Sequence, residues 1–158
     1  MPTTVLPTMP LPSINCLNLI KAFEGCILKA YVDPGSGNLP ITIGYGSTLY
    51  QNGMKIFLGQ TITQDVANSL LLWEVNKKAH ELQLPFALLQ CRLDAIVSFA
   101  YNLGIGAWNG SNLKLKIIAN PADPSIRDEF MKWVRAGNTK MPGLVRRRTA
   151  EANLYFGV

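Results

Sequence analysis

Two acidic side chains stand at the junctions of predicted secondary-structure elements within residues 20–47, and this stretch constrains the fold more than any other. Apolar residues recur at steps of three and four up to Glu24, which predicts one buried face of a helix. Residues 27–32 instead alternate, as in a half-buried strand, and Asp33 opens a turn rich in glycine and proline. Residues 41–43 then return as a second strand. The sequence therefore predicts a helix followed by a β-hairpin, with a carboxylate at each junction.

The spacing places these two carboxylates in different surroundings. Glu24 follows Ile20 by four residues and Leu17 by seven, so it lies on or beside the apolar helical face. Burial against apolar atoms disfavours the charged form, so we expect a raised pKa and a protonated Glu24. Asp33 lies in a polar turn that favours its ionised form. Such a pair suits glycoside hydrolysis, although each residue alone is more simply explained as a local cap or an ordinary turn aspartate.

The order of these residues resembles one known family. The pattern E-G-x5-Y-x-D followed by T-I-G-x-G is similar to that of the phage-type lysozymes, glycoside hydrolase family 24. The resemblance implies that Glu24 is the acid, that Asp33 lies across the scissile bond, and that Thr42 helps to position the attacking water. The segment from Asp33 to Thr42 is longer here than in the T-even phage enzymes and carries two prolines. Ser47 and Thr48 therefore stay as alternative hydroxyl groups.

Two later segments follow the same family in order. The run S-F-A-Y-N-L-G resembles the family's S-F-x-F-N-x-G, which meets the far wall of the cleft. By this match Tyr101, Asn102 and Ser111 contact sugar, although a cap or packing role fits each of them equally well. The C-terminal part resembles the family's W-x3-G and G-L-x-x-R-R-x-x-E-x-x-L patterns, so the resemblance covers about residues 14–156.

The remaining periodicity predicts a mainly α-helical α+β fold. Thr61 or Thr63 caps a long helix that runs to Leu82 and joins a small lobe with the two acids to a larger helical lobe. Further helices are predicted at residues 86–103, 112–119 and 124–137. The resemblance implies that this is the two-lobed, lysozyme-like fold. The charged residues that we expect to bind the lobes together rather than touch substrate are Arg147, Arg148 and Glu151.

Composition points to one folded domain, at residues 14–158, behind a proline-rich leader at residues 1–13. Hydrophobic residues make up 48% of the chain and charged residues only 16%, which excludes a disordered protein. Cys16, Cys26 and Cys91 have no metal-ligand spacing, and we expect free thiols in a reducing cytoplasm. We expect no cofactor and no bound metal.

The chain has no run of about 18 apolar residues and no signal-peptide pattern. We therefore expect a protein without a membrane anchor that stays in the host cytoplasm. The resemblance implies release to the cell wall, in the periplasm, through a membrane lesion made by another protein, such as a holin. We expect a monomer.

The net charge of +5 favours an anionic polymer as partner, with basic residues concentrated after Lys114 and at residues 146–148. A solvated basic face is the simpler explanation for scattered lysines. Nucleic acid fits the charge, but the chain has none of the known nucleic-acid-binding motifs. Bacterial peptidoglycan and other anionic envelope polymers fit both the charge and the two acids.

The sequence therefore predicts a muramidase that cleaves the β-1,4 bond between N-acetylmuramic acid and N-acetylglucosamine. The resemblance implies inversion of configuration, which needs room for a water between the two carboxyl groups. A lytic transglycosylase is one alternative, but it needs no water-directing Asp33 and Thr42. A cationic membrane-disrupting protein is another, and it would depend on the basic C-terminal third rather than on Glu24.

Overall fold

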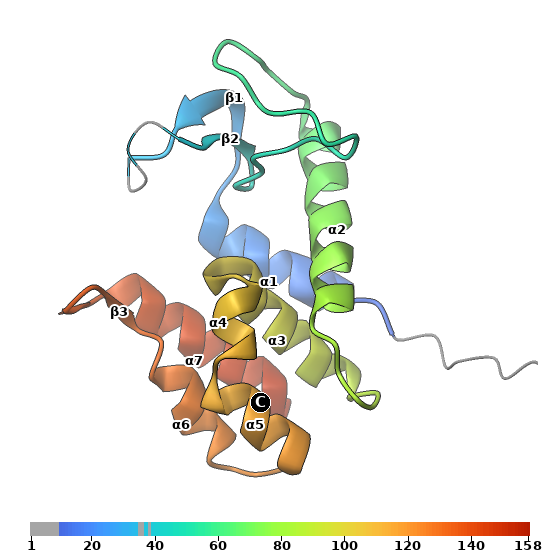
Figure 1. Cartoon of the computed structure of the whole chain (residues 1–158), viewed down its shortest axis with the longest axis vertical. Helices are drawn as coiled ribbons and strands as arrows, with labels where there is room; N and C mark the ends of the chain where they lie inside the picture. Colours follow the sequence, from blue (N-terminus) through green and yellow to red (C-terminus); the bar gives the residue numbers. More distant parts are fainter. Residues whose placement is uncertain (1–9, 35–36, 38) are drawn as a thin grey trace, which may run out of the picture.

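Two lobes joined by one long helix make up the chain as the structure describes it (Figure 1). The structure is a computed structural model that describes residues 10–34, 37 and 39–158. In chain order the elements are α1 (Ile14–Glu24), β1 (Ile27–Val32), β2 (Ile41–Gly44), α2 (Gln64–Glu81), α3 (Gln90–Leu103), α4 (Ile105–Asn109), α5 (Asn112–Ala119), α6 (Ile126–Met131), β3 (Arg135–Ala136), β4 (Thr139–Lys140) and α7 (Pro142–Phe156). The small lobe holds β1 and β2, and α1 lies with the helices of the larger lobe (Figure 1). The predicted mainly helical α+β fold is confirmed.

The first helix begins and ends at residues that cap it. The Ser13 hydroxyl accepts a hydrogen bond from the Asn15 amide at 3.2 Å, and Gly25 follows the helix with φ +67°. Residues with side chains rarely adopt that backbone conformation, so Gly25 turns the chain out of the helix. The buried Asp94 of α3 accepts hydrogen bonds from the Ser13 amide and hydroxyl. These contacts fix Glu24 as the last residue of α1 and hold the helix on the larger lobe.

The predicted hairpin forms with an antiparallel register that pairs Tyr31 with Thr42 and Val32 with Ile41. The loop after β2 covers the other edge of β1, because the Ala30 amide donates to the Gln60 carbonyl at 2.9 Å. A separate small core supports this lobe and consists of Ala30, Ile43, Ile56 and Leu70. The position of Thr42 is therefore set by its pairing with Tyr31 and by its neighbour Ile43, which is buried in this core.

The helix α2 connects the two lobes. The Thr63 hydroxyl accepts a hydrogen bond from the Val66 amide at 3.2 Å, so Thr63, one of the two predicted caps, begins the helix. Leu70 belongs to the small core, whereas Leu71 and Val75 belong to the large one. The large core is centred on α3, which packs against α7, α1, α2 and α4. One helix thus contributes to both cores and sets how the lobes face each other.

Two predicted helices differ from the observed ones. The helix predicted at residues 86–103 begins only at Gln90, because the preceding segment buries Leu88 in the large core without forming a helix. The helix predicted at residues 124–137 ends at Met131, and the chain then forms the short hairpin β3–β4. Gly137 adopts φ +57° in the two-residue turn of this hairpin, a conformation that lets the chain reverse between β3 and β4.

The predicted leader lies largely outside the described residues. Its described part, residues 10–13, precedes α1 without regular structure, and the Gln90 side chain donates to the Leu11 carbonyl at 2.9 Å. Within residues 10–34, 37 and 39–158, no helix combines the length and the apolar character that crossing a bilayer requires.

Candidate active site

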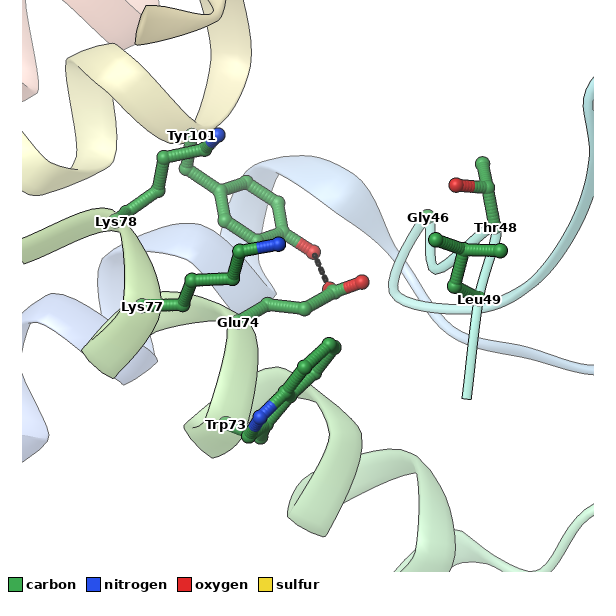
Figure 2. Close-up of a pocket in the computed structure, with 8 residues that line it drawn as sticks. All are labelled: Gly46, Thr48, Leu49, Trp73, Glu74, Lys77, Lys78 and Tyr101. Carbon is green, nitrogen blue, oxygen red and sulfur yellow. Dashed lines mark hydrogen bonds between the residues drawn. The ribbon is translucent and has the colours of Figure 1, made fainter. Parts of the chain in front are cut away.

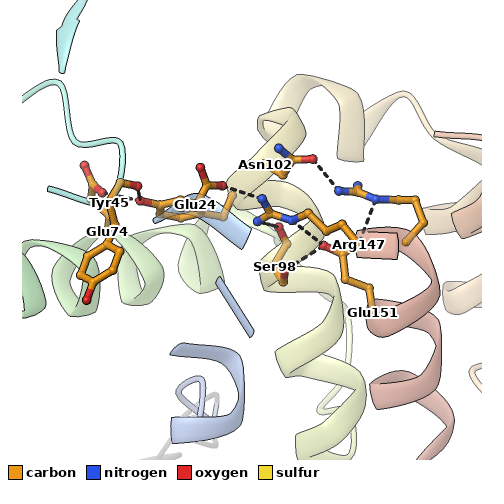
Figure 3. A network of polar contacts seen from close by, with 9 residues as sticks. Glu24, Tyr45, Glu74, Ser98, Asn102, Arg147 and Glu151 are labelled. Carbon is orange, nitrogen blue, oxygen red and sulfur yellow. Dashed lines mark hydrogen bonds and ion pairs between the residues drawn. The ribbon is translucent and has the colours of Figure 1, made fainter. Parts of the chain in front are cut away.

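Glu24 lies at the C-terminal end of α1, where that helix meets α7. Arg147 donates from Nη1 to Glu24 Oε1 at 2.6 Å, and 24% of the Glu24 side chain is exposed (Figure 3). The guanidinium group also lies over the ring of Phe23, 5.7 Å from its centre. The sequence predicted an apolar setting for Glu24, and this prediction is incomplete. Local periodicity does not reveal a cationic partner that lies far along the chain.

Asp33 and Thr42 lie on the hairpin that follows α1. Asp33 comes directly after β1 and is exposed, whereas Thr42 is buried in β2 and its hydroxyl donates to the Pro40 carbonyl at 3.3 Å. Tyr31 pairs with Thr42 across the hairpin. Burial raises the pKa of Tyr31, and the charges of Asp33 and Glu24 raise it further. One tyrosine therefore lies within electrostatic range of both carboxylates and pairs with the threonine.

The two alternative hydroxyl groups have other roles. Ser47 is buried, and its hydroxyl donates to Glu74 Oε2 at 3.1 Å. Thr48 lines a cavity between α2 and the turn after β2, together with Trp73. Among the three candidate hydroxyls, Thr42 is the one paired with Tyr31 in the hairpin.

Tyr101 reaches from α3 to the turn after β2. Its hydroxyl lies 2.9 Å from the Tyr45 carbonyl and 3.1 Å from Glu74 Oε2, so it bridges the larger lobe, the small lobe and α2. Burial is the main reason that the pKa of Tyr101 is raised, and the nearby carboxylates of Glu74 and Glu24 add to the shift. The neutral phenol is therefore the form that joins the lobes. The sequence did not single out Glu74, because a glutamate three and four residues before two lysines is typical of a solvent-exposed helical face.

Asn102 is held near Glu24 by Arg148 of α7. Its carbonyl oxygen accepts a hydrogen bond from Arg148 Nη2, and Asn102, Glu24 and Arg147 line one cavity of about 500 Å³. Met141 and Arg146 line the same cavity, from the beginning of α7. The side chains of Glu24 and Asn102, predicted from separate motifs, thus face one space.

The fully buried Glu151 organises both arginines. Arg147 Nε lies 3.3 Å from Glu151 Oε1, which also accepts from the Ser98 hydroxyl at 2.7 Å (Figure 3). Arg148 Nε lies 3.1 Å from Glu151 Oε2, an ion pair without hydrogen-bond alignment. Burial raises the pKa of Glu151, and the two guanidinium groups oppose that shift. These contacts join α7 to α3 and to Glu24 at the end of α1, so they hold the larger lobe together and do not bind the two lobes to each other as predicted.

Ser111 lies apart from these groups. Its hydroxyl donates to the Trp108 carbonyl at 2.8 Å and accepts from the Lys114 amide at 3.1 Å, and the residue is 2% exposed. The structure therefore places Ser111 as the buried cap of α5. A cap was one of the two roles that the sequence allowed for it, and sugar contact was the other. No group of three or more histidine, cysteine, aspartate or glutamate side chains within the described ranges has a metal-binding arrangement.

Residues 21–151 match the model of the phage lysozyme family. The endolysin of Bacillus phage B103 is 36% identical over 142 residues, which cover 89% of this chain and 52% of that protein. The chain thus spans about half the length of that relative. The endolysin of Acyrthosiphon pisum secondary endosymbiont phage 1 is 38% identical over 88% of this chain and 93% of its own length.

Solved structures agree with this match. The endolysin of Escherichia coli O157:H7 phage FAHEc1 is 32% identical and superposes with a TM-score of 0.79, with 94% of each chain covered. A mutant of P22 lysozyme is 30% identical and also has a TM-score of 0.79, over 94% of this chain and 99% of that one. The family match covers the helix, hairpin and α7 residues described above. The chain belongs to the phage lysozyme family.

Proposed function

We propose that this protein hydrolyses the β-1,4 bond from N-acetylmuramic acid to N-acetylglucosamine in peptidoglycan. The observation that carries the proposal is the arrangement around Tyr31, which pairs with Thr42 across the hairpin and lies within electrostatic range of both Glu24 and Asp33. Two carboxyl groups and a hydroxyl in one region are what acid-assisted glycoside hydrolysis requires. The endolysins among the relatives support peptidoglycan as the substrate.

Glu24 serves as the general acid in this proposal. Arg147 donates to its Oε1 and fixes the carboxyl group, while Oε2 faces Gly46, where a Cβ atom would lie 3.9 Å away. Because Gly46 has no side chain, the space beside Oε2 is open. We assign the catalytic proton to Oε2, from which it passes to the leaving glycosidic oxygen.

Asp33 and Thr42 act on the water from the hairpin. The exposed Asp33 carboxylate orients or activates the water and stabilises the developing positive charge, and the Thr42 hydroxyl helps to hold that water. Inversion by this route needs carboxyl groups about 6.5–9.5 Å apart in the substrate complex. Asn102 lines the cavity next to Glu24 and is the proposed sugar contact on the larger lobe.

The proposal extends to the protein's partners. Glycan strands of peptidoglycan are the substrate, and the catalytic steps assigned above involve no metal or cofactor. The family resemblance supports a monomer that reaches the wall from the host cytoplasm with the help of a holin.

Mass spectrometry of fragments released from purified peptidoglycan tests the proposal. The wild type should release fragments with a hydrated reducing-end muramic acid, and Glu24→Gln should release none. Glu81→Gln is the matched control, because Glu81 pairs with surface lysines of α2 and should leave the products unchanged. Fragments lighter by one water would instead establish a transglycosylase. Bacterial killing by Glu24→Gln without any fragments would move the function to the membrane.

A further inference from the structure

A second cavity, of about 320 Å³, lies between α2 and the turn after β2. Figure 2 shows the side chains of Trp73, Glu74 and Lys77 on the α2 side, and Gly46, Thr48 and Leu49 across from them. Lys77 follows Glu74 by three positions and Trp73 by four, so its side chain lies next to both of theirs on the helix surface. None of the roles assigned above uses Trp73 or Lys77.

The cavity adjoins the candidate active site through Gly46. Gly46 lines it, and the Cβ that this residue lacks would lie 3.9 Å from Glu24 Oε2. Tyr101 also lines the cavity and is hydrogen-bonded to the Tyr45 carbonyl next to Gly46. The cavity therefore begins at the turn that faces the Glu24 carboxyl group, and Trp73 lies on its far side.

The lining combines a flat apolar face with polar groups. Trp73 is partly exposed, and its indole presents a ring on which an apolar molecular face can stack. Glu74 accepts hydrogen bonds from Ser47 and Tyr101 through Oε2, and its other carboxyl oxygen points toward the Gly46 loop (Figure 2). A pyranose ring has matching parts, because its C–H face is apolar and its rim carries hydroxyl and amide hydrogens that a carboxylate accepts.

The charges at this site do not favour a simple anion. Lys77 and Lys78 both lie near Glu81, at 3.9 and 3.1 Å, and the carboxyl group of Glu74 lines the same cavity. Two ammonium groups are thus balanced by two carboxyl groups. Lys77 Nζ also lies 5.5 Å from the centre of the Trp73 ring and helps to hold the indole in place.

We propose that this cavity is a remote saccharide subsite, in which Trp73 stacks on an N-acetylated aminosugar of the glycan strand and Glu74 accepts from its hydroxyl or amide hydrogens. The inference rests on the proposed function, since it assigns part of the same substrate to a second place. Trp73 is a binding residue, so its effect depends on whether the strand is long enough to reach it.

Binding in an inactive background tests the subsite without hydrolysis. Peptidoglycan strands freed of stem peptides and sorted by length are titrated calorimetrically into Glu24→Gln, with and without Trp73→Ala. Affinity of the parent should rise with strand length, and Trp73→Ala should lower it by about 10-fold for long strands only, since one stacking contact is lost. Trp73→Phe should recover most of the loss. Phe57→Ala removes another exposed aromatic ring, outside the lining of this cavity, and should change no affinity.

The outcomes separate the two proposals. An equal effect of Trp73→Ala at every length, or none at any length, overturns the subsite, and a melting curve shows whether the variant is folded. If long strands bind through Trp73 but the wild type never cleaves them, the subsite stands and the proposed hydrolysis fails. If the wild type cleaves strands but Trp73→Ala leaves the length dependence of binding unchanged, the proposed hydrolysis stands and the subsite fails.

Discussion

Arg147 and Glu24 are 123 positions apart in the chain, yet Nη1 of one lies 2.6 Å from Oε1 of the other. The contact joins the last residue of α1 to α7. Arg147 also touches Glu151, which is fully buried, so a single guanidinium group is shared by one carboxyl group facing a cavity and one inside the core. The orientation of Glu24 therefore depends on the packing of α7.

Arg147→Ala should destabilise the protein by about 3–5 kcal/mol, because it leaves Glu151 buried with one of its two cationic partners removed. Urea unfolding measures the change. Arg146→Ala is the matched control, because Arg146 directly precedes Arg147 in the chain but is exposed. Its effect on stability should stay within about 0.5 kcal/mol. Equal stability of the two variants would contradict a structural role for Arg147.

Glu74→Gln should make stability less sensitive to pH. Burial raises the pKa of Glu74 above its ordinary value of 4.5, so the folded protein binds this proton more tightly than the unfolded chain does. The resulting stabilisation is complete below that ordinary value and is lost as the pH rises through the higher, folded-state pKa. Relative to the wild type, Glu74→Gln should therefore gain stability as the pH rises from 4 toward neutrality. Urea unfolding of the wild type and of Glu74→Gln at several pH values tests this, and parallel pH profiles of the two proteins would contradict it.

Thr42→Ala should lower kcat by about 100-fold or more, if the hydroxyl positions the attacking water. Thr42→Ser keeps the hydroxyl in β2 and should retain most of the activity. Release of reducing ends from peptidoglycan measures both rates. Ser47→Ala serves as a comparison, because Ser47 donates to Glu74 and its loss should affect stability more than kcat. Full activity of Thr42→Ala would remove Thr42 from the mechanism.

Ser111→Ala should cost about 1 kcal/mol of stability and leave KM unchanged, because the hydroxyl caps α5 and is buried. Ser111→Thr should recover much of the loss, because its hydroxyl can both cap the helix and donate to the Trp108 carbonyl. Thermal unfolding and kinetics on purified peptidoglycan give the two quantities. A raised KM with normal stability would instead support the sugar contact that the family resemblance implies.

Local sequence signals predicted the region of the acids well. The apolar repeat predicted the helix that ends at Glu24, where Gly25 follows, and alternation along residues 27–32 predicted the first strand of the hairpin. The β3–β4 hairpin was missed because the apolar spacing of α6 continues as far as Trp133, two residues beyond the observed end of the helix. Only Gly137, in the turn of the hairpin, signals that the chain reverses.

Contacts between distant segments were harder to predict. The partner of Glu24 comes from α7, and a helical repeat in α1 carries no information about it. Glu74 was missed for a related reason. A glutamate near two lysines on a helix is typically exposed to solvent. Only the contacts from Tyr101 of α3 and Ser47 after β2 place Glu74 between the lobes.

The small core of Ala30, Ile43, Ile56 and Leu70 has a consequence for how activity is lost on heating. Asp33 and Thr42 belong to the hairpin above this core, whereas α1, which ends at Glu24, is anchored by Cys16 and Ile20 in the much larger one. A lobe with so few buried side chains opens locally at lower free energy than the rest of the molecule. Each such opening separates the two acids while Glu24 stays folded. Inactivation should then precede global unfolding, and amide hydrogen exchange should be faster in β2 than in α3.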